Sequence, residues 1–338
     1  MKFSPLLLAA TMALPSSGET IYTIPNGYTK ITITPADVSG SKLTSISATL
    51  LQDVELAGSV TLGTYTDNAD PAKDTNTLSV SGVTWAADEW TAEPHIAYIS
   101  VQDDVDNADG IAPAEEAFFI TANTVGGGIT VETTFDLANK FPATTSIKIR
   151  KANTVASILN SLSTGSATFQ SADRVFVWNG TGWQSLRILS GTWRDADSLT
   201  TIVNGMVIFP EEGIFVQRTG TGVMSLTLFG EVPAAPQIAT IEANGFLSSR
   251  YPVGTTLASL GLQDANWQTA DRVYVWDGSS WLSNRFLSGN WRNSDSLTQI
   301  TNDLVISSST AVFVSRDAPI AGSGGGVITP FPTNYNID

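Results

Sequence analysis

Two segments of this chain repeat one another. Residues 171–218 align with residues 269–316 at a constant offset of 98, without a gap, and 26 of the 48 positions are identical. Both copies contain a tryptophan-rich hairpin, DRVFVWNGTGWQSLRILSGTWR from Asp173 and DRVYVWDGSSWLSNRFLSGNWR from Asp271. A long solenoid usually needs three or more units. Two copies therefore predict two independent domains in tandem that share one fold.

The similarity extends upstream, where TVASIL at Thr154 resembles TLASLG at Thr256, and EVPAAPQ separates the copies. These features predict five regions: a signal peptide (1–18), an N-terminal β domain (19–150), module 1 (151–233), module 2 (238–319) and a Gly-rich tail (320–338). The tail begins as a flexible linker. Its VITPFP motif could instead dock as an edge strand.

The fold class follows from short runs of Val, Ile, Thr and aromatic residues between clusters of Gly, Asn, Asp and Ser. Examples are YTKITIT, HIAYISV, GITVETT and AVFVSR. This spacing is typical of all-β proteins. Only TVASILNSL and TTLASLGL are briefly helical in pattern. We predict an all-β protein with tandem β-sandwich-like or small β-barrel-like domains, two of them duplicated.

The first residues, MKFSPLLLAATMALPSSG, have the layout of a secretory signal peptide, with a cleavage site near Gly18. The apolar run is shorter than the roughly 20 residues that span a bilayer. No later segment approaches that length, so we predict a secreted protein of the extracellular space or cell envelope, without a membrane span.

Charge and residue usage narrow the function. The net charge of −15 disfavours nucleic acid and anionic membranes as partners, because both attract Lys and Arg. The chain has no Cys, which excludes disulfides and thiol chemistry, and its single histidine, His95, is predicted to be a surface or packing residue. The sequence contains no catalytic or nucleotide-binding motif that we recognise. We therefore predict a protein that is not an enzyme, although counting carboxylates leaves a glycosidase pair open.

The hairpin has two chemically different faces. Val175 and Val177 point to one side of the first strand, and Arg174, Phe176 and Trp178 to the other. A hairpin loop of two or four residues brings Trp183, Ser185 and Arg187 of the second strand onto the same side as Trp178. The aliphatic face is predicted to be core, and the other forms a Trp/Arg face.

Lysine is absent after Lys151, whereas eight of the nine following Arg residues form four matched pairs. Arg stacks on indoles and binds carboxylates better than Lys does, and Asp173, Asp197, Asp271 and Asp295 are available as partners. The face has three interpretations: a ladder that rigidifies the hairpin, a surface for self-association or a cell-surface protein, and a platform for glycans. The candidate binding residues are Arg174, Trp178, Trp183, Arg187, Trp193, Arg194, Arg272, Trp276, Trp281, Arg285, Trp291 and Arg292.

The segment DDVDNADG is the densest acidic cluster. Asp103, Asp104, Asp106 and Asp109 could supply oxygen ligands to calcium, although the spacing does not match an EF-hand. A solvated turn is the alternative, and we expect the turn. No other cofactor is predicted.

The motifs IPNGYTKITI, NTLSVSGVTW, IKIRKANTVASIL and ADRVYVWDGSSW resemble those of an uncharacterised family of secreted β-rich proteins from Verrucomicrobia and related bacteria. The resemblance covers nearly the whole mature chain and implies export, but it assigns no catalytic residues. We therefore expect a non-enzymatic structural or interaction protein of the cell surface or extracellular matrix that can self-assemble. A carbohydrate-binding protein is the alternative, and a polysaccharide-acting enzyme is the third hypothesis.

Overall fold

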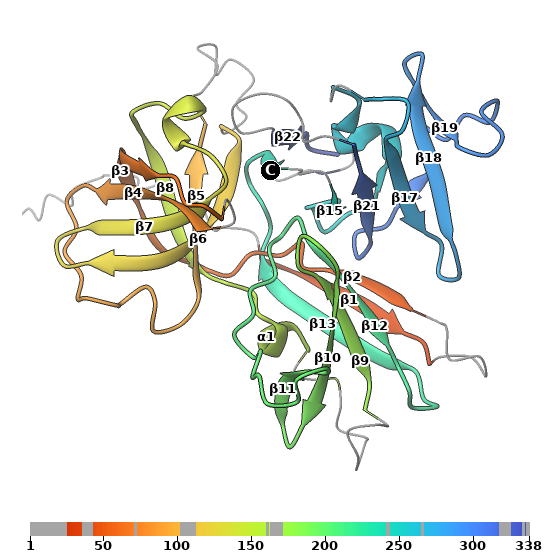
Figure 1. Ribbon diagram of the computed structural model, residues 1–338, viewed down its shortest axis with the longest axis horizontal. Helices are drawn as coiled ribbons and strands as arrows, with labels where there is room; N and C mark the ends of the chain where they lie inside the picture. The colour runs from red at the N-terminus through yellow and green to blue at the C-terminus, as the bar shows by residue number, and fades with distance from the viewer. Residues whose placement is uncertain are drawn as a thin grey trace, which may run out of the picture.

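A computed structural model describes residues 26–35, 43–70, 73–101, 113–159, 162, 172–240, 244–264, 267–317, 326–332 and 335. Strands account for 52% of the structure and helices for 6%, and the sheets form several β domains. The predicted all-β fold is therefore confirmed. Figure 1 shows a barrel on the left, module 1 below it and module 2 on the right.

The barrel is a closed ring of six antiparallel strands, in the order β6-β5-β8-β3-β4-β7 with β7 paired back to β6. Its strands are β3 (Val54–Thr66), β4 (Asp74–Val80), β5 (His95–Ser100), β6 (Glu115–Thr124), β7 (Gly128–Thr133) and β8 (Thr144–Lys151), and β7 is followed by the short helix η2 (Leu137–Asn139). Alternate inward side chains such as Val60, Ile99 and Val131 fill the barrel. His95 is a buried packing residue, and its ring contacts that of Trp90 edge to face, with centroids 5.2 Å apart.

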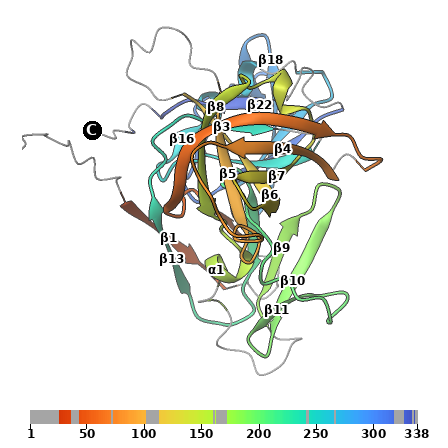
Figure 2. The ribbon, with the colours of Figure 1, turned by 90° about the vertical axis from the view of Figure 1, so that its left-hand side faces the viewer.

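Module 1 contains a five-stranded sheet in the order β11-β10-β9-β12-β2 and a separate two-stranded ribbon, β1-β13. Its elements are β1 (Asn26–Ile33), β2 (Thr44–Ser47), α1 (Val155–Leu159), β9 (Arg174–Trp178), β10 (Trp183–Leu189), β11 (Thr192–Asp195), β12 (Gly213–Gln217) and β13 (Met224–Glu231). Figure 2 shows α1 between the ribbon and the sheet. Apolar residues from all three layers form one core.

Module 2 has the same strand order, β19-β18-β17-β21-β15, and its own ribbon, β14-β22. Its elements are β14 (Gln237–Thr240), β15 (Asn244–Ser248), β16 (Thr255–Thr256), η4 (Leu257–Leu260), η5 (Leu262–Asp264), β17 (Arg272–Trp276), β18 (Trp281–Leu287), β19 (Asn290–Asn293), β20 (Val305–Ile306), β21 (Ala311–Ser315) and β22 (Gly326–Thr329). Within the tail, VITPFP thus contributes an edge strand rather than only a linker.

The fifth strand lies at a different sequence separation from the rest of its sheet in the two modules. Ile46 of β2 pairs with Ile214, Leu247 of β15 pairs with Val312, and Ile214 aligns with Val312 in the repeat. Strand β2 is therefore equivalent to β15 at an offset of 201 residues. Thr154 and Thr256, which pair with the equivalent residues Val207 and Val305, are separated by only 102 residues. The difference of 99 residues is the barrel, which is inserted into module 1 between β2 and α1.

This insertion changes the expected domain boundaries. The region 19–150 was predicted as one N-terminal domain, but β1 and β2 belong to the layers of module 1, and Figure 1 shows both beside β12 and β13. The alternation of apolar residues in β1 gave no sign of its partner, because β13 lies about 190 residues downstream.

Candidate functional site

The aromatic part of the Trp/Arg face lies between the two modules. Trp178 of module 1 contacts Phe313 of module 2 with ring centroids 5.1 Å apart. The equivalent pair, Trp276 and Phe215, has centroids 5.9 Å apart. The two sheets therefore face one another about a pseudo-two-fold axis. We call this contact the aromatic interface; its members are Leu43, Phe176, Trp178, Phe215, Phe246, Trp276, Ala311 and Phe313.

Polar contacts obey the same pseudo-symmetry. The hydroxyl of Ser47 donates to the carbonyl of Ser308 at 3.4 Å, and the equivalent Ser248 donates to the carbonyl of Pro210 at 2.6 Å. Near the axis the backbones approach so closely that a Cβ at Gly213 would lie 2.3 Å from the Cβ of Ala311. Glycine at this position allows the sheets to come into contact.

Two indoles form the rim of this interface. Trp183 is 43% exposed and Trp281 is 37% exposed, and each packs edge-on against the other indole of its own hairpin, at 75° and 63°. They flank a crevice of about 410 Å³. A flat glycan platform needs coplanar rings, and the two indoles within each hairpin are not coplanar. Both hairpins use a four-residue loop, which pairs Trp178 with Trp183 and Trp276 with Trp281.

Trp193 and Trp291 do not belong to the Trp/Arg face. Both side chains are fully buried in the cores of their modules. Their strands follow tight turns at Ser190-Gly191 and Ser288-Gly289, which place the indoles on the aliphatic side of the sheet. These two candidates are therefore core residues and unavailable to a partner.

The arginines lie at the other end of the same face. Arg174, Arg187 and Arg194 are direct cross-strand neighbours, and Arg285 and Arg292 are neighbours in module 2, beside Arg272 on β17. We call these two rows the Arg ladders. Burial, and then the charge of Arg174, lower the pKa of Arg187.

Each Arg ladder ends beside an exposed loop. Arg194 donates to the carbonyls of Leu199 and Thr200 at 3.3 and 3.2 Å, and Arg292 donates to the carbonyl of Leu297 at 3.2 Å. The two loops expose the same apolar residues in both modules. We call Leu199 with Ile202, and Leu297 with Ile300, the loop tips.

The expected Arg–indole stacks are not found on this face. In the described part of the chain, the cation–ring contacts involve Lys140, Arg150 and Arg316. Two of the carboxylates that the sequence offers as partners do form ion pairs with arginines: Asp173 pairs with Arg218 at 3.0 Å, and Asp271 pairs with Arg316 at 3.3 Å. Both carboxylates also accept from the backbone after β12 or β21, which gives them a structural role.

The proposed calcium ligands Asp103, Asp104, Asp106 and Asp109 lie outside the described residues. Among the residues that are described, no group of three or more His, Asp or Glu side chains is arranged to hold a metal ion. The described helices are also too short or too polar to cross a membrane.

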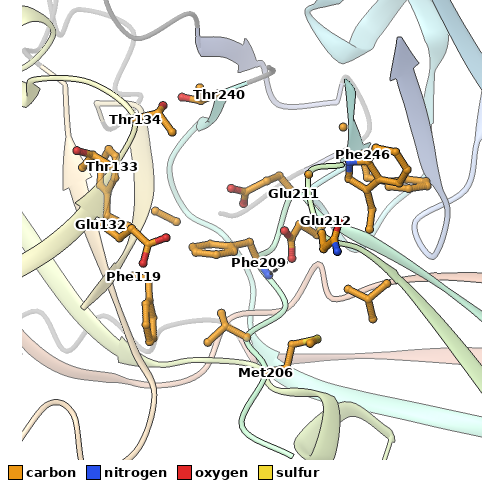
Figure 3. Close-up of a pocket in the computed structure, with 18 of the residues that line it drawn as sticks. Phe119, Glu132, Thr133, Thr134, Met206, Phe209, Glu211, Glu212, Thr240 and Phe246 are labelled. Carbon is orange, nitrogen blue, oxygen red and sulfur yellow. Dashed lines mark hydrogen bonds between the residues drawn. The ribbon is translucent and has the colours of Figure 1, made fainter. Parts of the chain in front are cut away.

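A cavity of about 650 Å³ lies where the barrel and both modules meet. Figure 3 shows Glu132 of the barrel and Glu211 of module 1 pointing into it from opposite walls, with the ring of Phe209 between them. Glu212 accepts a hydrogen bond from the backbone N–H of Phe209 at 3.0 Å. Module 2 supplies Thr240 and Phe246.

The cavity changes the acidity of its carboxyl groups. Burial raises the pKa of Glu211 to about 7, although nearby Arg250 acts in the opposite direction. Burial raises the pKa of Glu212 to about 8, against the effect of the Phe209 N–H. Burial, assisted by Asp70, also raises the pKa of Glu132. Strongly shifted carboxyl groups in a cavity are typical of functional sites.

No family model, curated protein or solved structure matches this chain. Its function must therefore be argued from the aromatic interface, the loop tips and the cavity.

Trp178 is the one cavity-lining residue among the sequence candidates, and sequence reasoning did not single out the cavity carboxyl groups. Glu211 and Glu212 fall in a segment where module 2 has Ser309 and Thr310, so the repeat draws no attention to them. The available signal was this difference between the copies: two adjacent carboxyl groups precede a buried strand in module 1 only.

Proposed function

We propose that the protein is an exported, non-enzymatic interaction protein that self-associates through its Arg ladders and loop tips. The observation that carries the proposal is the exposure of the same apolar pair in both modules. Ile202 is 60% exposed and Ile300 is 54% exposed, although each is the direct neighbour of a ladder arginine, Arg194 or Arg292. Contiguous exposed apolar side chains on a surface mark interaction sites, and each loop tip places two such side chains three residues apart.

The aromatic interface makes the two loop tips a fixed pair. Because the aromatic ends of both sheets pack against each other, the opposite ends carry the Arg ladders to separate positions on the molecule. One rigid molecule then presents two equivalent binding surfaces. Two binding surfaces per molecule allow growth beyond a dimer when each surface meets a different copy.

Charge supplies the complementary surface. The two Arg ladders contain six arginines, of which Arg187 is buried, and removing all six from the net charge of −15 leaves −21 on the remainder of the chain. A basic tip with apolar residues is therefore complementary to the acidic body of a second copy. Such contacts weaken as salt screens them, over a Debye length of about 10 Å at 0.1 M.

Sedimentation of the full secreted chain over a range of concentration and salt tests this proposal. We expect larger species at low salt, which revert to monomer in the double variant Ile202→Ser, Ile300→Ser, with an intermediate effect for either single change. Val125→Ser is the matched control, because Val125 is an equally exposed apolar residue on the barrel. A monomer under all conditions, or association that the double variant leaves unchanged, would contradict the proposal.

Carbohydrate binding is a second candidate, favoured by the crevice between Trp183 and Trp281. Both indoles are more than one third exposed, and a sugar could stack on the exposed part. Affinity electrophoresis in soluble polysaccharides compares the wild type with Trp183→Ala and Trp281→Ala. Retardation that depends on these indoles, without self-association, would favour this candidate.

A further inference from the structure

We propose that the cavity between the barrel and the two modules is a binding site for an organic ammonium ion. This inference is independent of self-association, because the loop tips are not among the cavity-lining residues. The cavity volume of about 650 Å³ lies within the range of small-molecule sites. All three domains contribute to its wall, so the site exists only in the assembled chain.

The charge of the wall selects the sign of the ligand. Four carboxyl groups line the cavity, from Glu116, Glu132, Glu211 and Glu212, and none of the described lining residues is basic. Glu116 already has partners, since its carboxylate accepts from Lys140 at 2.6 Å and from Thr240. Among the described residues, the other three carboxyl groups form no salt bridge, and Glu212 accepts from the backbone N–H of Phe209. When ionised, these groups balance a positive charge and repel an anion.

The aromatic rings in the wall favour an organic cation over a bare metal ion. Phe119, Phe209, Trp178 and Phe246 all line the cavity. Ring faces attract ammonium groups, and a cage of aromatic and acidic side chains is the usual receptor for them. The carboxyl groups of Glu132 and Glu211 point into the cavity from opposite walls, on either side of the ring of Phe209, so carboxyl groups and an aromatic ring line the same space.

The neighbouring charges make binding depend on pH. Burial raises the pKa of Glu211 to about 7 and that of Glu212 to about 8, so both carboxyl groups take up protons at a higher pH than an exposed glutamate does. Arg250 of module 2 lowers and Glu116 of the barrel raises the pKa of Glu211, and Asp70 raises that of Glu132. A cation stabilises the ionised carboxylates, so binding releases protons and strengthens as the pH rises.

Calorimetric titration of the full chain with choline tests the site, because the charge of a quaternary ammonium does not change with pH. The comparison ligand is its neutral isostere, in which carbon replaces the nitrogen. We expect saturable choline binding that is at least about tenfold tighter at pH 9 than at pH 6, with proton release, and about tenfold weaker binding of the isostere.

Two isosteric variants assign the site. Glu132→Gln and Glu211→Gln keep the shape of the wall, and we expect each to weaken choline binding by about tenfold. Asp303→Asn is the control, because Asp303 is exposed and does not line the cavity. Circular dichroism verifies the fold of each variant. The proposal is overturned if choline does not bind, if the isostere binds equally well, or if Glu132→Gln and Glu211→Gln bind choline as tightly as the Asp303→Asn control does.

Discussion

Modules 1 and 2 build the same sheet but attach their ribbons differently. In module 2, strand β14 of the ribbon extends the barrel by pairing in parallel with β6, and the N–H of Glu115 donates to the carbonyl of Pro236 at 2.8 Å. In module 1, the equivalent β1 has β13 as its only strand partner among the described residues, and Tyr28 and Phe229 stay exposed. The repeat thus specifies the sheet, whereas the inserted barrel determines which ribbon is covered.

The residues buried beside the two ribbons also differ between the modules. Arg250 is buried beside the module 2 ribbon and donates to the carbonyls of Gln237 and Val327. At an offset of 201 the equivalent residue in module 1 is Thr49, whose buried hydroxyl has no hydrogen-bond partner among the described residues. Module 1 instead meets the barrel through an ion pair between Arg150 and Glu231. The comparison between the modules predicts different responses to mutation.

The largest expected effect is at Arg250. Arg250→Met should destabilise the protein by about 2–4 kcal/mol, because two buried carbonyls lose their charged donor. The loss is limited to this range because the substitution also removes the cost of burying a charge. Thr49→Val should instead stabilise it by about 1 kcal/mol, since it removes an unpaired buried hydroxyl. Urea unfolding followed by tryptophan fluorescence measures both. Equal effects at the two positions would show that the ribbons are held in the same way.

The next prediction concerns the pseudo-two-fold axis. Gly213→Ala should cost about 1–3 kcal/mol by pushing the sheets apart, since the added Cβ meets the Cβ of Ala311. The exchange Gly213→Ala with Ala311→Gly keeps the total volume and should recover most of this loss. Denaturation of the three proteins measures the coupling. If the exchange is as unstable as the single change, the axis is not symmetric at this contact.

A smaller effect should appear in the pH dependence of stability, which we expect to differ between equivalent positions of the two modules. The folded pKa of Glu212 is about 8, above the ordinary 4.5, so its stabilising contribution is full below about pH 4.5 and is lost as the pH rises toward 8. Glu212→Gln should therefore raise stability at pH 9 by about 1–2 kcal/mol, less than the full shift implies because water reaches the cavity wall. Thr310→Val at the equivalent position of module 2 should change stability equally at pH 5 and pH 9. Thermal melts across this range provide the measurement, and a pH-independent gain for Glu212→Gln would contradict the assignment.

The smallest effect should be the same in both copies. Ser190 and Ser288 both have φ of 51°, a left-handed conformation that Asn tolerates better than Ser. Ser190→Asn and Ser288→Asn should each stabilise the protein by about 0.5 kcal/mol. Chemical denaturation of the two single variants checks this equality. A gain in only one copy would indicate that the turns carry different strain.

Much of the local structure could be predicted from sequence. The alternation from Arg174 to Trp178 predicted both faces of β9, and Asn179-Gly180 predicted the turn that follows. The alternation within one strand does not place Trp193, whose side is set by the two-residue turn at Ser190-Gly191 that pairs it with Ile188 of the aliphatic face. The cavity carboxyl groups could not be predicted, because their pKa values depend on walls from three domains.

The sequence by itself determined the all-β character, the two matched hairpins and their aliphatic cores, since period-two alternation and turn residues act over a few positions. Tertiary structure decided the origin of the fifth strands, the closure of the barrel, the covering of the indoles and the formation of the cavity. These features depend on contacts such as the hydrogen bond from the N–H of Ala311 to the hydroxyl of Ser45, 266 residues away. Pairing at that distance depends on which complementary surfaces remain after each domain has formed its core, and no local pattern records that choice.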